Sequence, residues 1–162
     1  MITEKEKKLY DLLEKLGIAY IRHEHPPVYT VEEAKAYWRD IPGVHCKNLF
    51  LRNSKGTRHF LVVLEQGKRV DLKELAEKTA AGKLSFASAN RLEKYLGLVT
   101  GAVSPFGLIN DMNKEVEVVL DKDLLQSDQV NFHPNVNTAT LTLSFADFKR
   151  FLDHCGQKVL IL

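Results

Sequence analysis

The sequence predicts an α+β fold in which helices surround one curved, mixed sheet. Three observations lead to this prediction: helical and β-rich segments alternate along the chain, a tight turn joins two of the β-rich segments, and no internal repeat or linker-like stretch divides the 162 residues. A hairpin within an otherwise alternating pattern favours a mixed sheet over a purely parallel one. The length and the continuous pattern together predict a single domain over residues 1–162.

Two helices separated by a strand are predicted in the first quarter of the chain. Each helix begins with a threonine that is followed three residues later by glutamate, which is the capping-box pattern. Leucines at helical spacing extend the first helix to a glycine, and two consecutive prolines end the strand because they remove two backbone donors. The predicted elements are a helix from Thr3 to Gly17, a strand at residues 18–23 and a helix from Thr30 to Trp38.

The middle of the chain is predicted to hold a β-hairpin and then two helices around a short strand. Turn residues at positions 53–56 separate two apolar runs, which predicts the hairpin. An aspartate followed three residues later by glutamate caps the next helix, and a serine caps the one after it. The predicted elements are strands at residues 45–52 and 57–64, a helix from Asp71, a strand at residues 84–87 and a helix from Ser88 to Tyr95.

The last third of the chain is predicted to contain four strands and one helix. Its strands are indicated by β-branched residues or by alternating apolar residues, and its helix by phenylalanines at helical spacing behind a serine cap. The predicted elements are strands at residues 115–120, 130–132 and 138–143, a helix from Ser144 to Gly156 and a strand at residues 159–162.

Composition excludes disordered and membrane-spanning classes. Charged residues make up 27% of the chain and hydrophobic residues 44%, and no apolar run is long enough to cross a bilayer. No apolar segment follows the charged N-terminus, so we expect a cytoplasmic protein without membrane association. Cys46 and Cys155 are far apart and are expected to be free thiols. The six histidines have no metal-ligand spacing, so no metal site is expected.

One predicted strand carries a lysine where a cation is unexpected. Lys47 shares one face with Leu49 and Leu51, whereas Asn48 and Phe50 share the other, so both faces carry large apolar groups. Because burial of an unpaired ammonium is costly, the pattern indicates an anion or a polar cavity beside Lys47. Alternatively, Lys47 lies at the frayed start of the strand and extends to water.

Three further segments are candidates for a functional surface. The glycine-containing loop at residues 100–108 is predicted to hold a turn, with Pro105 at its second position and Gly107 at its fourth. Such a loop can aim backbone N–H groups at an oxyanion or a phosphate, and it is equally typical of a tight connection. His133 follows a predicted strand. A histidine at such a position can transfer a proton or bind a substrate, or it can have a purely structural role. Residues 68–94 carry a net charge of +3, which suits bound phosphates or solvated helix faces.

Four segments, taken in order, resemble a known enzyme family. They are Cys46-Lys47-Asn48-Leu49-Phe50-Leu51, His59-Phe60-Leu61-Val62, Gly101-Ala102-Val103-Ser104-Pro105-Phe106-Gly107-Leu108, and Phe132-His133-Pro134 before Asn137-Thr138. Together they resemble the YbaK/ProX family of trans-editing aminoacyl-tRNA deacylases, and within it the ProX-type (PrdX-like) branch of freestanding Ala-tRNA(Pro) deacylases. The resemblance extends over nearly the whole chain, including His25-Pro26-Pro27 and Thr30.

The resemblance implies a barrel-like mixed sheet with a pocket for the aminoacylated end of tRNA, and no metal or organic cofactor. Lys47 and Gly101 are the catalytic residues that it implies. The substrate-binding residues that it implies are Thr30, Asn48, Ser104, Pro105, Phe106, Gly107 and His133. It also implies attack by water, aided by the ribose hydroxyl of the substrate, which agrees with the lack of a serine elbow motif in the sequence.

The implied substrate is mischarged Ala-tRNA(Pro), whose acceptor end is the expected partner. Prolyl-tRNA synthetase and an elongation factor are candidate transient partners. A synthetase pocket made for proline cannot strongly exclude alanine, because each missing methylene is worth only about 1–3 kcal/mol, so a second site must remove the wrong amino acid. Two alternatives stay open: a deacylase for tRNA carrying cysteine, serine or a related amino acid, and a non-catalytic tRNA-binding or regulatory module of the same fold.

Overall fold

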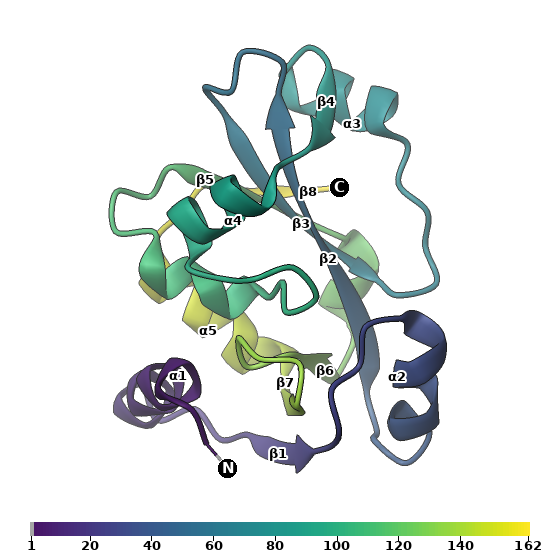
Figure 1. Ribbon diagram of the computed structural model, residues 1–162, viewed down its shortest axis with the longest axis vertical. Helices are drawn as coiled ribbons and strands as arrows, with labels where there is room; N and C mark the ends of the chain where they lie inside the picture. The colour runs from purple at the N-terminus through teal and green to yellow at the C-terminus, as the bar shows by residue number, and fades with distance from the viewer. Residues whose placement is uncertain (1) are drawn as a thin grey trace.

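Helices and strands alternate through residues 2–162, the part of the chain that the computed structural model describes (Figure 1). The helices are α1 (Glu4–Lys15), α2 (Val31–Trp38), α3 (Leu72–Thr79), α4 (Ala89–Leu96) and α5 (Phe145–Cys155), with 3-10 helices η1 (Pro105–Asn110) and η2 (Lys122–Gln126). The strands are β1 (Ile21–Glu24), β2 (Val44–Asn53), β3 (His59–Glu65), β4 (Leu84–Phe86), β5 (Val116–Leu120), β6 (Gln129–Phe132), β7 (Ala139–Ser144) and β8 (Val159–Ile161). No helix within residues 2–162 is both long and apolar enough to span a bilayer.

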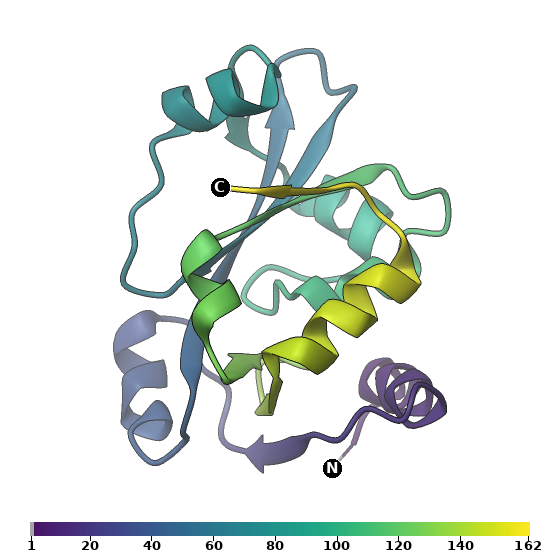
Figure 2. The same ribbon diagram turned by 180° about the vertical axis from the view of Figure 1, so that it is seen from behind.

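All eight strands belong to one sheet, which is mixed as predicted. The strand order is β1-β7-β6-β2-β3-β5-β8, and β4 pairs with β2 beside this path. The predicted hairpin is present as the antiparallel pair of β2 and β3, whereas β2 runs parallel to β6 and β5 runs parallel to both β3 and β8. Figures 1 and 2 show β2 and β3 running steeply across the view while β8 lies almost horizontal, so the sheet is strongly twisted.

Side-chain caps fix the predicted helix starts. The caps that accept hydrogen bonds from first-turn N–H groups are Thr3, Thr30, Asp71, Ser88 and Ser144. At α1 the capping box is complete, because the Glu6 carboxylate accepts a return bond from the N–H of Thr3. At α2 the Glu33 carboxylate instead accepts from the N–H of Tyr29, one residue before the cap. This bond ties the segment that enters α2 to the first turn of the helix.

The first strand begins three residues later than the β-rich pattern predicts. The N–H of Ile18 donates to the carbonyl of Leu13, and the N–H of Gly17 donates to the carbonyl of Glu14. These two bonds form a Schellman-type end of α1 around Gly17, whose φ is +69°. Because Ile18 is held in this cap and buried in the core, it cannot begin the strand, and pairing with β7 starts at Ile21.

Two apolar clusters lie on opposite faces of the central strands. Leu61 and Val63 of β3 belong to the larger cluster, which also contains buried side chains of α1, α4, η1 and α5. Phe60 and Val62 belong to the smaller cluster, which packs against α3. The strand is therefore buried on both faces, and its alternating side chains join the two layers into one framework.

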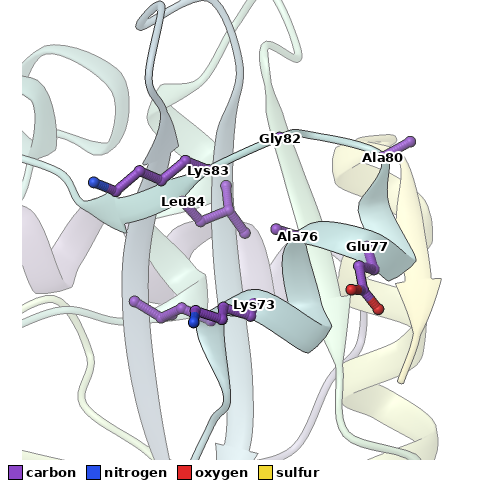
Figure 3. A pocket seen from close by; sticks show the side chains of 8 residues that line it. Lys73, Ala76, Glu77, Ala80, Gly82, Lys83 and Leu84 are labelled. Carbon is purple, nitrogen blue, oxygen red and sulfur yellow. The ribbon is translucent and has the colours of Figure 1, made fainter.

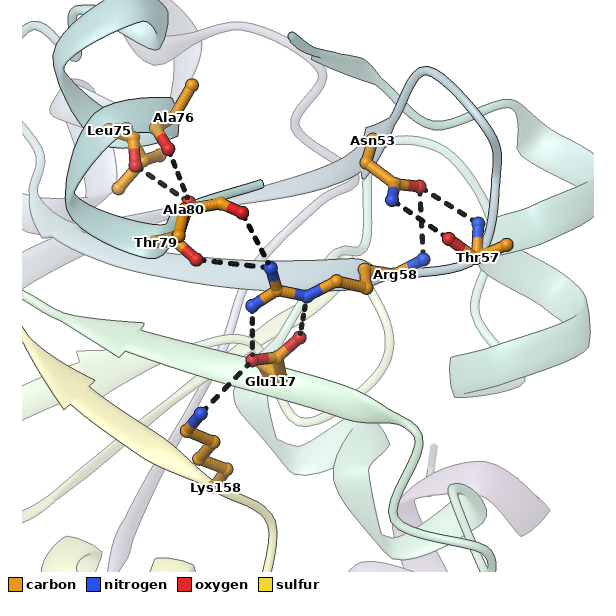
Figure 4. Close-up of polar contacts among 9 residues, drawn as sticks. All are labelled: Asn53, Thr57, Arg58, Leu75, Ala76, Thr79, Ala80, Glu117 and Lys158. Carbon is orange, nitrogen blue, oxygen red and sulfur yellow. Dashed lines mark hydrogen bonds and ion pairs between the residues drawn. The ribbon is translucent and has the colours of Figure 1, made fainter. Parts of the chain in front are cut away.

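The side chain of Arg58 joins α3 to the sheet at the edge of the smaller cluster (Figure 4). Its guanidinium makes two 2.9 Å hydrogen bonds to the Glu117 carboxylate on β5. The remaining nitrogen donates to the carbonyls of Thr79 and Ala80, at 3.1 and 3.2 Å, where α3 ends. Arg58 thus satisfies terminal helix carbonyls and a partly buried carboxylate at once.

Replacement of Arg58 by alanine is expected to lower the free energy of unfolding by about 1–2 kcal/mol, because four charge-assisted bonds are lost at a partly exposed site. Lysine should recover only part of this, since an ammonium cannot bind a carboxylate in the two-pronged geometry. Urea unfolding measures the change. Lys158→Ala is the control, because Lys158 is 76% exposed and 3.9 Å from Glu117. Equal stability of the Arg58→Ala and Lys158→Ala proteins would contradict the proposed clamp.

Candidate active site

A cavity of about 290 Å³ lies between α2, β2 and the loop that joins α4 to η1. The loop reaches toward β2 between α2 and α4 (Figure 1). Five of the nine predicted site residues line the cavity: Thr30, Lys47, Asn48, Gly101 and His133. Val28, Ala34 and Val103 supply apolar walls. The volume lies at the lower end of the usual range for ligand sites, so the cavity suits a small group.

The cavity lies at a gap in the pairing of β2. On the edge opposite β3, β6 pairs with β2 only at Val44 and His45, and β4 pairs only from Leu51 onward, so residues 46–49 have no strand beside them there. The carbonyl of His45 accepts a hydrogen bond from the N–H of Gln66, on the side of β3. The carbonyl of Phe50 points to the opposite edge, where it accepts from the N–H of Ala87. Main-chain groups alternate in direction along a strand, so the N–H and C=O of Asn48 point into the gap.

Lys47 is the fourth residue of β2 and pairs with Leu64 of β3, so it does not lie at a frayed strand end. Its side chain is half-buried and lines the cavity. Among residues 2–162, no carboxylate pairs with its ammonium. The positive charge therefore remains available to a ligand in the cavity, and of the two sequence interpretations the structure agrees with the polar cavity.

Gly101 occupies the third position of a tight turn at the cavity. The N–H of Ala102 donates to the carbonyl of Val99 at 3.1 Å, and the φ of Gly101 is +92°. A type II turn requires positive φ at this position, which explains why a glycine stands there. Within the described part of the chain, the N–H groups of Gly101 and Val103 donate to no acceptor, and both residues line the cavity.

Asn48 and His133 place polar atoms on the cavity wall. The side-chain amide of Asn48 donates to the carbonyl of Val103 at 3.4 Å, which ties β2 to the glycine loop. The Nδ1 of His133 lies 3.1 Å from the carbonyl of Ala139, so this nitrogen carries the proton and Nε2 is left as an acceptor. Burial lowers the pKa of His133 below its ordinary value, so the ring is neutral near pH 7.

Four predicted substrate-binding residues do not line the cavity: Ser104, Pro105, Phe106 and Gly107. All four are buried in η1 and its cap, and Phe106 packs edge-on against Phe132 in the larger cluster. The predicted turn is present, because the N–H of Gly107 donates to the carbonyl of Ser104 at 3.2 Å. In this geometry the segment anchors the loop, and Gly101 and Val103 upstream of it line the cavity. A role of the four residues in substrate binding stays a prediction.

Other reactive groups near the cavity are poorly suited to nucleophilic attack. Cys46 lines the cavity, but burial raises the pKa of its thiol to about 12, so the thiolate that would attack is scarce near neutral pH. Both cysteines are free, as predicted, and both are buried. Over residues 2–162, His, Cys, Asp and Glu form no group of three or more that could hold a metal ion.

A larger groove, of about 810 Å³, lies between α3 and β4 (Figure 3). Leu72, Ala76 and Leu84 give it an apolar lining, with Lys73 and Lys83 beside them. None of the nine predicted site residues lines this groove. Because catalysis on a carbonyl group needs several polar groups that converge on one point, the smaller cavity at Lys47 is the candidate active site.

Comparison with known proteins places the chain in a family. Residues 25–151 match the family described as aminoacyl-tRNA editing domain. The chain is 50% identical over 146 residues to the prolyl-tRNA editing protein ProX of Acetoanaerobium sticklandii, covering 89% of this chain and 88% of that protein. It is 35% identical over 162 residues to prolyl-tRNA synthetase associated domain-containing protein 1 of Danio rerio, covering 99% and 88% of the two chains.

A solved structure agrees with this relationship at the level of the fold. A crystal structure of a candidate trans-editing enzyme for prolyl-tRNA synthetase superposes with a TM-score of 0.74 at 23% identity, covering 100% of this chain and 98% of that one. Its mixed sheet and surrounding helices are the architecture described above. Sequence and fold agree, and the chain belongs to the aminoacyl-tRNA editing domain family.

Proposed function

We propose that this protein hydrolyses the ester that joins alanine to tRNA(Pro) and releases alanine and free tRNA. The observation that carries the proposal is the unpaired Lys47 ammonium in one small cavity with the free N–H groups of Gly101 and Val103. Family membership and the 50% identity to a prolyl-tRNA editing protein support the same activity. The acceptor end of tRNA(Pro) is the partner that this activity requires, with prolyl-tRNA synthetase or an elongation factor as transient partners.

The proposed reaction needs positioning and charge stabilisation more than a protein nucleophile. Water attacks the carbonyl carbon of the ester, negative charge forms on the carbonyl oxygen, and the carbon–oxygen bond to the ribose then breaks. The leaving ribose oxygen takes a proton that originates from the attacking water. Lys47 stabilises negative charge on the oxyanion or on the terminal phosphate, and the N–H groups of Gly101 and Val103 donate to the oxyanion.

The ester itself explains why the site manages without a covalent step. An aminoacyl ester is already activated, and the ribose carries a neighbouring hydroxyl that can assist the attacking water. Neutral Cys46 is an unsuitable nucleophile, whereas neutral His133 offers Nε2 as a hydrogen-bond acceptor. His133 is therefore proposed to bind the amino-acid portion of the substrate, together with Asn48 and Thr30, which line the same cavity.

The apolar walls of the cavity suit an amino acid with a small side chain, such as alanine. The apolar walls at Val28, Ala34 and Val103 bound a space of about 290 Å³, which must hold the amino acid and part of the ribose. A site of this kind rejects larger side chains by steric clash. A synthetase pocket built for proline cannot reject the smaller alanine in this way, because alanine fits inside it. The synthetase site thus excludes amino acids larger than proline, and the editing site excludes side chains larger than that of alanine.

A deacylation panel tests the proposal. Purified protein is incubated with tRNA(Pro) carrying alanine or proline, and with tRNAs carrying cysteine or serine, and the loss of each ester is followed over time. We expect Ala-tRNA(Pro) to be hydrolysed fastest and Pro-tRNA(Pro) to be spared. Preference for the cysteine or serine ester would overturn the alanine assignment, and binding without hydrolysis of any ester would show a non-catalytic tRNA-binding module.

A further inference from the structure

An exposed tyrosine stands at the mouth of the candidate active site. Tyr29 lines the cavity, yet 72% of its surface is exposed to solvent. Its ring lies against the glycine turn, since a Cβ atom added at Gly101 would lie 3.6 Å from the Cδ1 of Tyr29. One edge of the ring thus contacts the site, and most of the ring remains uncovered.

The backbone on both sides of Tyr29 is fixed, which together with the contact at Gly101 limits where the ring can lie. The N–H of Val28 donates to the carbonyl of Asn137, and the Asn137 amide returns a bond to the carbonyl of Val28, both at 3.3 Å. On the other side, the N–H of Tyr29 donates to the Glu33 carboxylate, and Thr30 caps α2. A pre-positioned aromatic ring loses little conformational entropy when a flat ligand packs against it.

Other exposed aromatic side chains do not combine these features. The ring of Tyr37 is already stacked on His25, with 5.3 Å between ring centroids. Phe86 is 62% exposed but lies on β4 and does not line the cavity. Trp38 also lines the cavity, but its ring is already stacked on His45, with 4.6 Å between ring centroids. Tyr29 is therefore the exposed aromatic residue whose position points to a ligand shared with the active site.

We infer that Tyr29 is a stacking platform for the base of the terminal nucleotide of the aminoacylated RNA. The inference rests on the proposed function, in which the aminoacyl ester occupies the cavity and the attached nucleoside extends through its mouth. Every base has a flat π face, and proteins that bind single-stranded RNA ends stack such bases on aromatic side chains. The neighbouring Gly101 turn lacks a side chain, so a base can approach the ring closely above the scissile ester.

The kinetic test compares substrates with and without the base. The variants are Tyr29→Ala, Tyr29→Phe and Tyr29→Trp, with Phe86→Ala as the control for loss of an exposed aromatic ring. The substrates are Ala-tRNA(Pro) and an alanyl ester of a base-free ribose. We expect Tyr29→Ala to lower kcat/KM for Ala-tRNA(Pro) by about tenfold, mainly through KM, and to leave the base-free ester unchanged. Phenylalanine and tryptophan should preserve activity, as should Phe86→Ala.

A binding experiment decides the inference even if the proposed hydrolysis fails. An uncharged RNA hairpin with the acceptor-stem sequence is prepared with its terminal adenosine and without it, and the affinity of each for the protein is measured. Tyr29→Ala should weaken binding of the complete hairpin and leave the shortened one unaffected. The inference is overturned if both hairpins lose affinity equally, if neither does, or if the base-free ester is slowed as much as Ala-tRNA(Pro). Absence of hydrolysis by the wild-type protein would overturn only the proposed function.

Discussion

Replacement of Lys47 by methionine is expected to lower the rate of Ala-tRNA(Pro) deacylation by about 100-fold or more while the protein stays folded. Methionine keeps an unbranched apolar chain in β2 and removes only the charge, so the change isolates the ammonium. Loss of one preorganised group that stabilises developing negative charge usually lowers kcat by about 10²–10³. Single-turnover deacylation measures the effect, because it separates the chemical step from product release.

Two matched variants sharpen the experiment on Lys47. Lys55→Met removes a lysine from the exposed hairpin turn and should leave the rate unchanged. Lys47→Arg keeps the charge but spreads it over a larger planar group, so a small recovery is expected in a cavity of this size. Thermal unfolding of each variant confirms that the fold is intact. If Lys47→Met retains nearly the wild-type rate, the ammonium has no catalytic role and the proposed mechanism is wrong.

Replacement of Gly101 by alanine is expected to lower kcat/KM by about tenfold or more. A Cβ at this position would meet the Tyr29 ring only at ordinary contact distance, 3.6 Å, so a steric clash is not the cause. The cause is the φ of +92°, which an alanine resists, so that the turn shifts and its N–H groups move away from the oxyanion. Displacement of such donors by a fraction of an ångström is enough to weaken transition-state binding.

Gly82 provides the control for the backbone effect of this substitution. Its φ is +74°, and a Cβ atom there would meet no atom within 4 Å, but it lies in the turn between α3 and β4 and not at the cavity. Gly82→Ala should reduce stability by a similar amount and leave kcat/KM unchanged. If Gly101→Ala lowers activity no more than Gly82→Ala does, the glycine turn takes no part in catalysis.

The helices were the most predictable part of the fold, because their signals are local. Thr3, Asp71 and Ser144 each cap a helix that begins at the next residue. The ends of the strands were predicted less accurately than those of the helices. Ile18, for example, has β-rich neighbours, but its N–H donates to a carbonyl of the preceding helix. The 3-10 helix η1 was predicted only as its first turn, because continuation past Gly107 depends on burial of the segment in the core.

The candidate site was predictable where a residue conflicted with its local surroundings. Lys47 was identified because a cation fits poorly in an apolar strand, and the structure places it at a cavity. Motif resemblance added Gly101, but it also drew in Ser104 and Phe106, which support the loop from inside. Tyr29 gave no sequence signal, because its place at the cavity depends on its contact with Gly101, about seventy residues later in the chain.

The ends of two short strands leave a window in the sheet beside the cavity. β6 leaves β2 after His45 and β4 joins it at Leu51, so residues 46–49 of β2 face this window without a neighbouring strand. A strand rises about 3.3 Å per residue, so each extra residue of β4 or β6 that paired with β2 would shorten this window by about that length. Side-chain substitutions at Val28, Ala34 or Val103 can tune which acyl group fits, whereas extension of either short strand would close the window itself.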